Sequence, residues 1–555
     1  MAATAAIFHH PDAIERPDTP LAGRRIAGQS FLAGYVRHVE ADRLHSFAHQ
    51  NDHLDKFRKL VADYGWTGPV DTILAHEPDK LRNAGVAMLP GPNLASFAWT
   101  RRRAGQALYS LCGITHTVAT KRIMDGLMEG VSAPVERWDA IICTSRAVQR
   151  VVATQLDAVE AYLGQRFMAA RLPRPQLPVI PLGIDTGRFG RVDAERARWR
   201  QAFEADDETV VLMSMGRRTV AEKMHPVPMF QAAEMAAKQT GKKVALWMVG
   251  WFADEPTEEM HRSMAKEFAP SVDVRFPDGK DNELRYEIWS AADIFTLPVD
   301  NIQETYGLAP VEAMAAGLPV VVSDWDGFRD TVEHGVTGIR VPTRMSRPGT
   351  GIDIAERFED GRDVYHQYLV AVHQRTAIDV RGLAGAYAAL IKDPDLRAKM
   401  GQAGVQRART HYDWSAIVPQ YQALWGELNA IRAAEPPSSE RVQGAPSNPA
   451  AMDPFTLYAS YPAQHLLADT VLTAEAVTPE ARLEELVDLT GARRYRRIVA
   501  RSGELAAVQA AIHQLGPVRY QDLLARSSGS AAKLESCVFW LLKFDLIQIV
   551  QAGKT

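Results

Sequence analysis

Short apolar runs alternate with helical patterns along most of the chain, in two consecutive series. The first series has runs at residues 72–75, 85–89, 140–144 and 178–183, and the second has runs at residues 209–216, 244–250, 272–276, 294–297 and 320–322. Strands of a parallel sheet are buried on both faces, so they form continuous apolar runs separated by helices. The pattern predicts an α/β fold with two doubly wound domains, residues 1–195 and 196–432.

The pattern changes after residue 432. Residues 433–452 are rich in proline, serine and alanine, which is typical of a flexible linker. Residues 453–555 contain three helical patterns and a final apolar strand pattern, an order loosely similar to a winged helix. Their 11 Lys and Arg residues balance 11 Asp and Glu residues, and the basic run Arg493–Arg497 is interpreted as a solvated helix face, so nucleic-acid binding is not expected. We predict oligomerisation or docking on a protein partner, with acceptor handling as the alternative.

Composition describes an ordinary globular protein. The 555 residues are 46% hydrophobic and carry a net charge of −4, which offers no general attraction for nucleic acid. The apolar runs are all shorter than the ~18 residues of a membrane span, and the N-terminus lacks a secretory signal, so a cytoplasmic location is expected. Cys112, Cys143 and Cys537 have neither metal-ligand nor disulfide spacing and are interpreted as buried apolar residues.

The segment from Glu304 to Glu312 contains the most informative chemistry. Pro310 suits the first turn of a helix and Gly317 suits its end, which predicts a helix from Leu308 to about Ala316. The free amides and partial positive charge at the start of such a helix favour phosphate oxygens. The segment therefore predicts an anion site flanked by two carboxylates.

The spacing of Glu304 and Glu312 argues against glycoside hydrolysis. A rise of about 1.5 Å per helical residue, and more in the loop, places them roughly 10 to 15 Å apart. The carboxylates of a glycoside hydrolase lie only about 5 to 9.5 Å apart across one bond. A ligand with hydroxyls at both ends and a diphosphate between them fits better, and a nucleotide sugar has that layout.

At these residues the chain resembles the retaining glycosyltransferases of family 4, whose E-x7-E signature matches Glu304 and Glu312. The similarity extends upstream through residues 286–298 and downstream through residues 323–338. The resemblance implies a GT-B fold, with two Rossmann-like domains facing a cleft. It also implies that Glu304 contacts the donor sugar and Glu312 the ribose, while Tyr306, Gly307 and Leu308 complete the donor contacts.

A second segment, from Gly216 to Lys223, resembles the family's G-R-x-x-x-x-K motif, in which Arg and Lys contact the diphosphate. Lys223 lies one position later than the motif requires, so either Arg217 or Arg218 can take the Arg role. We favour Arg217 for catalysis and retain Arg218 as a donor-binding candidate. Two fixed positive charges would offset the charge that develops as the glycosidic bond breaks.

Two further candidates belong to the first domain. His116 follows the apolar run 108–114, at the end of a predicted strand where doubly wound sheets bind ligands, and the resemblance implies that it contacts the donor sugar. Gly28 resembles the glycine of the turn that precedes the first helix and faces the diphosphate. Both are expected in the cleft.

Three other segments bear on the architecture and the chemistry. Residues 181–189 resemble the segment that closes the first lobe in family 4, with Leu182 replacing the usual Asn, and the helix after Tyr412 resembles the one that returns to that lobe. The segment 344–374 is longer than the corresponding connection in family 4. We expect it to be an acceptor entrance, a subunit contact or a surface loop. Asp324 and Asp326 form a D-x-D at a place where the family has no metal role, so neither a metal nor a cofactor is expected.

These patterns predict a retaining, metal-independent glycosyltransferase that uses a nucleotide diphosphate sugar as co-substrate. The acceptor remains open among a glycan, a lipid-linked molecule and a protein. The alternatives are a catalytically silent GT-B scaffold that recruits partners, or a phosphorylase or hydrolase on the same fold. Residues 97–103 mix aromatic and basic side chains, and we interpret them as a basic helix face rather than a membrane contact.

Overall fold

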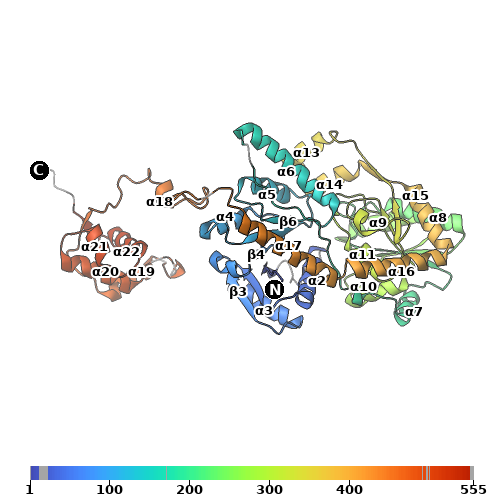
Figure 1. Ribbon diagram of the computed structural model, residues 1–555, viewed down its shortest axis with the longest axis horizontal. Coiled ribbons are helices and arrows are strands. Elements are labelled where there is room, and N and C mark those ends of the chain that lie inside the picture. The colour runs from blue at the N-terminus through green and yellow to red at the C-terminus, as the bar shows by residue number, and fades with distance from the viewer. Residues whose placement is uncertain are drawn as a thin grey trace. The chain divides into compact units, whose positions relative to one another are not determined.

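The computed structural model describes residues 2–11, 23–169, 172–439, 441–490, 492–495, 498 and 500–550. Internal contacts divide the chain into two compact units, Met1–Ala451 and Met452–Thr555. In Figure 1 the first unit runs from blue to orange, and the second is orange-red. The first unit contains both predicted lobes. Each unit is described by itself.

The first lobe is built on six parallel strands in the order β3-β2-β1-β4-β5-β6, the doubly wound order that places ligands at the strand ends. The strands are β1 (Ala6–Phe8), β2 (Leu44–Ala48), β3 (Val70–Leu74), β4 (Val86–Met88), β5 (Ser110–Ile114) and β6 (Ala140–Ile142). The helices are α2 (Gly23–His38), α3 (Asn51–Asp63), α4 (Ala95–Ala104), α5 (Lys121–Ser132) and α6 (Arg146–Phe167), with the short η1 (Pro78–Asn83).

The second lobe repeats this plan with the strand order β12-β11-β10-β7-β8-β9. Its strands are β7 (Val210–Met215), β8 (Val244–Val249), β9 (Asp273–Arg275), β10 (Ile294–Leu297), β11 (Val320–Ser323) and β12 (Gly338–Val341). Its helical elements are η2 (Thr186–Arg188), α7 (Asp193–Ala202), α8 (Val227–Thr240), α9 (Glu255–Phe268), α10 (Asn282–Glu287), η3 (Ile288–Ala291), α11 (Leu308–Ala315), α12 (Phe328–Thr331), α15 (Val380–Lys392) and α16 (Pro394–His411). The α/β prediction with two Rossmann-like domains is confirmed.

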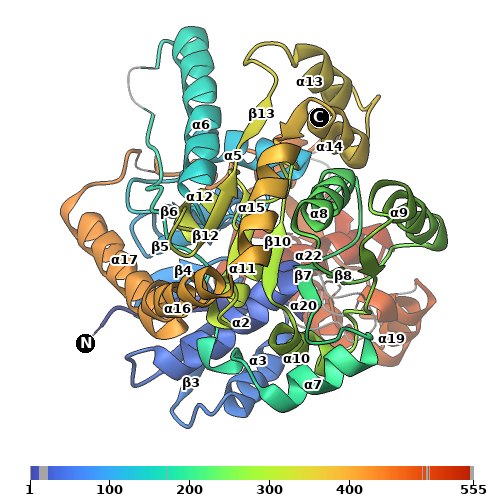
Figure 2. The same ribbon diagram turned by 90° about the vertical axis from the view of Figure 1, so that its right-hand side faces the viewer.

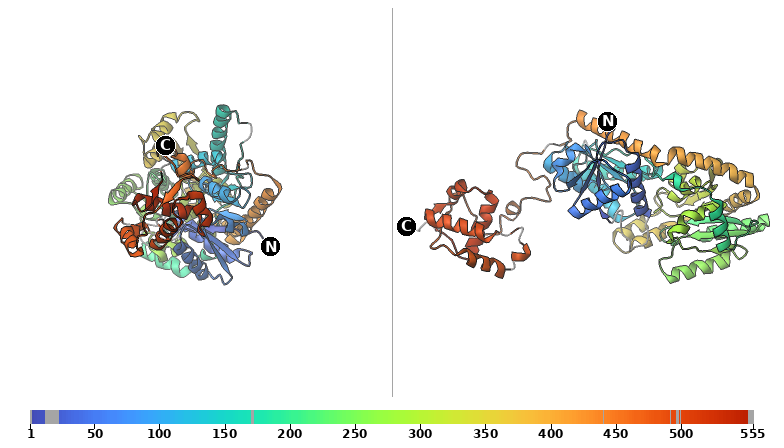
Figure 3. Two further views of the ribbon diagram at one scale, coloured as in Figure 1. Left: turned by 90° about the vertical axis from the view of Figure 1, so that its left-hand side faces the viewer. Right: turned by 90° about the horizontal axis from the view of Figure 1, so that it is seen from below.

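Helix α17 (Trp414–Ala434) returns from the second lobe to the first and crosses it in the right-hand view of Figure 3. The Trp414 indole Nε1 donates to Ser30 Oγ of α2 at 2.8 Å. Glycine is required on both sides of this indole, because a Cβ would lie 2.1 Å from the ring at Gly34 and 2.6 Å from it at Gly183. The indole therefore joins α2, the connection between the lobes and α17.

The longer connection after β12 folds into a small unit of its own, seen at the upper right of Figure 2. Strands β13 (Thr343–Met345) and β14 (Thr376–Ile378) pair antiparallel, and α13 (Ile352–Glu359) and α14 (Tyr365–His373) lie between them in sequence. The rings of Phe358 and Tyr368 stack at 4.3 Å between centroids and join the two helices. We call residues 343–378 the insertion.

The second unit combines helices with a three-stranded antiparallel sheet in the order β16-β15-β17. Its elements are α18 (Pro454–Leu457), β15 (Val471–Thr473), α19 (Glu480–Leu489), η4 (Ala492–Tyr495), α20 (Ser502–Leu515), β16 (Val518–Arg519), α21 (Tyr520–Arg526), α22 (Ala531–Lys543) and β17 (Gln548–Ile549). The three predicted helical patterns correspond to α20, α21 and α22. In the predicted basic run, Arg496 and Arg497 lie outside the described residues.

Two composition-based expectations can be compared with the structure. Cys112, Cys143 and Cys537 are all free and buried, as predicted. Within the part of the chain that the structure describes, no helix combines the length and the apolarity needed to cross a lipid bilayer.

A buried ion pair stabilises the first lobe. Arg101 of α4 and Asp139 before β6 have fully buried side chains, and Arg101 Nη2 donates to Asp139 Oδ2 at 2.9 Å. The same carboxylate accepts from the backbone N–H of Leu111 and Glu136. These contacts connect α4, β5 and the approach to β6.

We expect Asp139→Asn to destabilise the protein by about 3 to 5 kcal/mol, because it leaves the Arg101 charge buried without its anion. Urea unfolding monitored by circular dichroism measures this change. The control is Asp125→Asn, which breaks the exposed pair with Lys121 and is expected to cost under about 1 kcal/mol. Equal unfolding midpoints for the two variants would show that the buried pair has no special importance.

Candidate active site

A cavity of about 370 Å³ is lined by residues of both lobes, a size within the range of roughly 300 to 1,000 Å³ that is typical of small-molecule sites. The first lobe and the connection between the lobes contribute Ala27, His116, Thr117 and Leu182. The second lobe contributes Met215, Gly216, Arg217, Glu222, Lys223, Val249, Gly250, Trp251, Gly279, Arg285, Gln303, Glu304, Thr305, Tyr306, Gly307, Leu308, Ala309 and Glu312.

Helix α11 begins at Leu308, as predicted, and ends at Ala315. Its N-cap is Gly307, which has a φ of +86° and makes no side-chain capping hydrogen bond. A Cβ at this position would lie 2.2 Å from the Phe328 ring, so only glycine fits. Gly307, Leu308 and Ala309 line the cavity, which therefore receives the helix start without a side-chain cap.

Glu304 precedes this helix and pairs with Lys223. The Lys223 Nζ lies 2.6 Å from Glu304 Oε2, and their side chains are only 20% and 14% exposed. Burial raises the pKa of Glu304, but the charge and hydrogen bond of Lys223 oppose this effect and leave the pKa below its ordinary value. Glu304 is therefore an ionised hydrogen-bond acceptor beside a cation.

Arg217 and Arg218 have opposite orientations. Arg217 lines the cavity, and its guanidinium pairs with Glu222, the residue before Lys223. The Arg218 side chain is buried, its Nε donates to Met248 O at 2.8 Å, and it stacks over Phe252 at 4.5 Å. Backbone carbonyls and aromatic rings enclose the Arg218 guanidinium, and its contact with the donor stays a prediction.

Three glycines at the ends of β7, β8 and β9 pack their backbones together at the cavity wall. A Cβ on Gly250 would lie 1.9 Å from Gly216 O, and one on Gly279 would lie 2.9 Å from Gly250 Cα. The sequence analysis did not identify Gly250, Trp251, Gly279 or Arg285 as site residues. Gly216 and Gly250 directly follow β7 and β8, which was the available signal, and it indicated only where those strands end.

Glu312, on α11, also lines the cavity. Burial raises the pKa of Glu312, and the charge of Arg285 partly opposes that effect. The two predicted carboxylates therefore share one cavity but have opposite pKa shifts. Lys223 pairs with Glu304, while the charge of Arg285 acts on Glu312.

His116 lies beyond the end of β5 and lines the cavity from the first lobe. Its backbone carbonyl accepts a hydrogen bond from Thr305 Oγ1, so this loop contacts the segment that carries Glu304. The contact with a donor sugar stays a prediction.

Gly28 and Tyr306 differ from their expected arrangements. Gly28 lies inside α2 rather than in a turn before it, because the helix already begins at Gly23. Its neighbour Ala27 lines the cavity instead. Tyr306 belongs to the cavity wall, but its hydroxyl donates to Leu182 O at 2.8 Å. Its side chain thus connects the second lobe to the segment between the lobes.

The D-x-D carboxylates have protein partners. Asp324 lies 3.4 Å from Arg329 and 3.5 Å from Arg340. Asp326 accepts from Ser145 Oγ of the first lobe at 3.0 Å, and burial raises its pKa to about 7. Among the described residues, no group of three or more His, Cys, Asp or Glu side chains is arranged to hold a metal ion.

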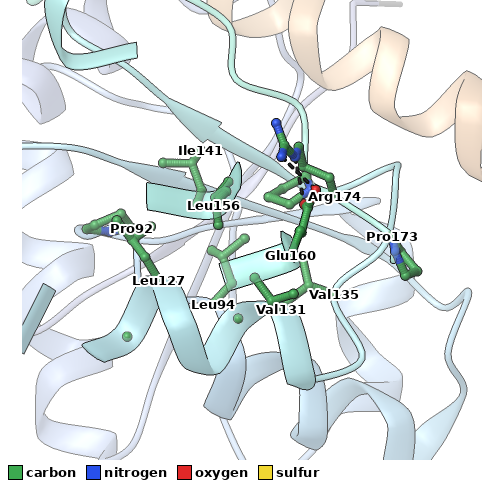
Figure 4. Close-up of a pocket in the computed structure, with 13 residues that line it drawn as sticks. Pro92, Leu94, Leu127, Val131, Val135, Ile141, Leu156, Glu160, Pro173 and Arg174 are labelled. Carbon is green, nitrogen blue, oxygen red and sulfur yellow. Dashed lines mark hydrogen bonds and ion pairs between the residues drawn. The ribbon is translucent and has the colours of Figure 1, made fainter. Parts of the chain in front are cut away.

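A second pocket lies within the first lobe, between α5 and α6 (Figure 4). Its walls are mainly apolar and include Leu127, Val131 and Leu156, and Arg174 pairs with Glu160 beside them at 2.7 Å. Its volume of about 10 Å³ holds roughly one water molecule. It is too small for a sugar nucleotide.

Comparisons with known proteins agree with the fold. Residues 195–348 match the family model of glycosyl transferases group 1. The chain is 25% identical over 422 residues to the GDP-mannose-dependent alpha-(1-6)-phosphatidylinositol monomannoside mannosyltransferase of Mycobacterium tuberculosis, covering 71% of this chain and 93% of that protein. It is 30% identical over 171 residues to the D-inositol 3-phosphate glycosyltransferase of Corynebacterium efficiens, covering 31% and 32% of the two chains.

Among solved structures, Anabaena Alr3699/HepE in complex with UDP and glucose matches with a TM-score of 0.50 at 14% identity. The match covers 76% of this chain and 100% of that chain. The family match falls on the lobe that contributes most of the cavity, and the mycobacterial relative is matched over nearly its whole length. The chain is thus similar to glycosyl transferases group 1 over residues 195–348, and its two Rossmann-like lobes have the GT-B fold.

Proposed function

We propose that the enzyme transfers a hexosyl group from a nucleoside diphosphate sugar with retention of anomeric configuration and without a metal ion. The observation that carries this proposal is the start of α11, which has no side-chain cap and opens into the cavity beside the Lys223–Glu304 pair. GDP-mannose is the first donor to test, because the mycobacterial relative is named for it.

The charges of the cavity suit a diphosphate. Three cations line it, and each is matched by an acid: Lys223 pairs with Glu304, Arg217 pairs with Glu222, and Arg285 influences Glu312. A diphosphate adds negative charge to this balanced set, and the amides at the start of α11 and the nearby cations offset it. The protein itself therefore supplies the positive charge that a metal ion provides in other transferases.

In the proposed reaction, the acceptor hydroxyl oxygen forms a bond to the anomeric carbon while the bond from that carbon to the diphosphate oxygen breaks. The acceptor proton moves to the departing diphosphate on the same face of the sugar. Glu304 accepts hydrogen bonds from the sugar hydroxyls and orients the ring. Lys223 and Arg217 stabilise the charge that develops on the leaving group.

Glu304→Gln and Lys223→Ala are each expected to lower kcat/KM for GDP-mannose by about a hundredfold or more, because each removes a preorganised charge at the reacting centre. Initial rates with purified protein measure this loss, and circular dichroism checks that each variant is folded. Glu259→Gln and Lys266→Ala, on the exposed face of α9 in the same lobe, are the matched controls. Full activity in both site variants would remove the assignment.

Chelation is expected to leave the rate within about twofold of the untreated enzyme, because Lys223, Arg217 and the α11 amides provide the charge stabilisation. The measurement is turnover after dialysis against EDTA, with and without added Mg²⁺ or Mn²⁺. A loss of activity that Mn²⁺ restores would contradict this expectation.

The first product formed is expected to keep the anomeric configuration of the donor sugar, because attack and departure share one face. Proton NMR of the anomeric signal at early reaction times measures the configuration directly. An inverted product would refute the same-face reaction and leave the donor-binding assignments intact.

A further inference from the structure

The insertion packs along the loop between β7 and α8, residues 216–226, which carries Arg217 and Lys223. At the start of α14, His366 Nε2 pairs with Glu222 Oε1. At the end of the same helix, the His373 ring lies 6.3 Å from the His225 ring, centroid to centroid. Helix α14 therefore contacts this loop at two points.

Glu222 has a contact on each carboxylate oxygen. Oε2 pairs with Arg217 Nη1, and Oε1 pairs with His366. The Glu222 side chain is 17% exposed and lines the cavity, whereas the Arg217 and His366 side chains are 37% and 61% exposed, so Glu222 is the enclosed member of each pair. The guanidinium has five N–H donors in a rigid plane, so an anchor on Nη1 leaves the other donors for a ligand.

The first turn of α14 also reaches the opposite lobe. Burial raises the pKa of Tyr365, and the Thr117 side chain, which lines the cavity beside His116, opposes that effect, so the two side chains lie near each other. The start of α14 therefore contacts the loop of the second lobe and lies near the first lobe's wall of the donor site.

We propose that Glu222 and His366 are positioning residues of the donor site: Glu222 holds the Arg217 guanidinium toward the diphosphate, and His366 of the insertion holds Glu222. The inference depends on the proposed function, because it requires Arg217 to contact the diphosphate. It assigns the insertion a role in turnover, exerted through one chain of contacts from His366 to Glu222 to Arg217.

The test is a set of single and double variants assayed in the full-length enzyme with GDP-mannose. Glu222→Gln is expected to lower donor kcat/KM by about tenfold and His366→Ala by about threefold, with acceptor KM unchanged, because each loosens a hydrogen bond to a charged group. His366→Gln keeps an N–H donor toward Glu222 and is expected to restore most of the activity that His366→Ala loses.

Non-additivity separates positioning from a general loss of structure. In an Arg217→Ala background, Glu222→Gln and His366→Ala are expected to have no further effect, because both act through the missing guanidinium. Arg362→Gln, which breaks an exposed pair with Asp360 on the same insertion, is the matched control and is expected to match the wild type.

The outcomes distinguish this inference from the proposed function. If the wild type transfers no sugar from any nucleotide donor tested, the proposed function fails. If the wild type is active and Arg217→Ala is impaired, but Glu222→Gln and His366→Ala match the wild type, only the positioning role fails. Improved donor KM in Glu222→Gln, or additive losses in the Arg217→Ala background, would also overturn that role.

Discussion

The site depends on the close packing of two glycines, Gly307 and Gly327, at the start of α11. Gly307 fits against the Phe328 ring, and Gly327 fits against the Tyr306 backbone, where a Cβ would lie 2.6 Å from Tyr306 Cα. This packing fixes the turn between β10 and α11 without a side-chain cap. The amides of the first helical turn are then directed to the cavity, and Glu304 lies within reach of Lys223.

The cavity exists because two lobes with the same strand order meet at their ligand-binding edges and are held together there. Arg146 N, at the start of α6, donates to Asp330 Oδ2 at 2.7 Å, and the neighbouring Ser145 Oγ donates to Asp326. At the connection between the lobes, the Trp414 indole of α17 packs between Gly34 and Gly183. These polar contacts and the packing of the Trp414 indole thus hold the two lobes together.

The charges within the cavity are balanced before any ligand binds. Glu222 and Glu304 pair with Arg217 and Lys223, whose side chains are 37% and 20% exposed, and so offset these charges in the folded protein. The same acids can orient these cations toward a diphosphate, because an Arg or Lys side chain has more donors than one carboxylate occupies. Stability and ligand recognition therefore use the same contacts.

The sequence by itself determined the two doubly wound lobes and the start of α11 at Leu308, because apolar periodicity, Pro310 and Gly317 act over a few neighbouring residues. Glu304 and Lys223 became candidates because their segments resemble motifs of family 4. Only the tertiary structure decided that Arg217 faces the cavity while Arg218 is enclosed, and that Gly28 lies inside a helix. The contact between Glu222 and His366 joins residues 144 positions apart. Side-chain direction and long-range proximity arise from packing between elements, which no local pattern encodes.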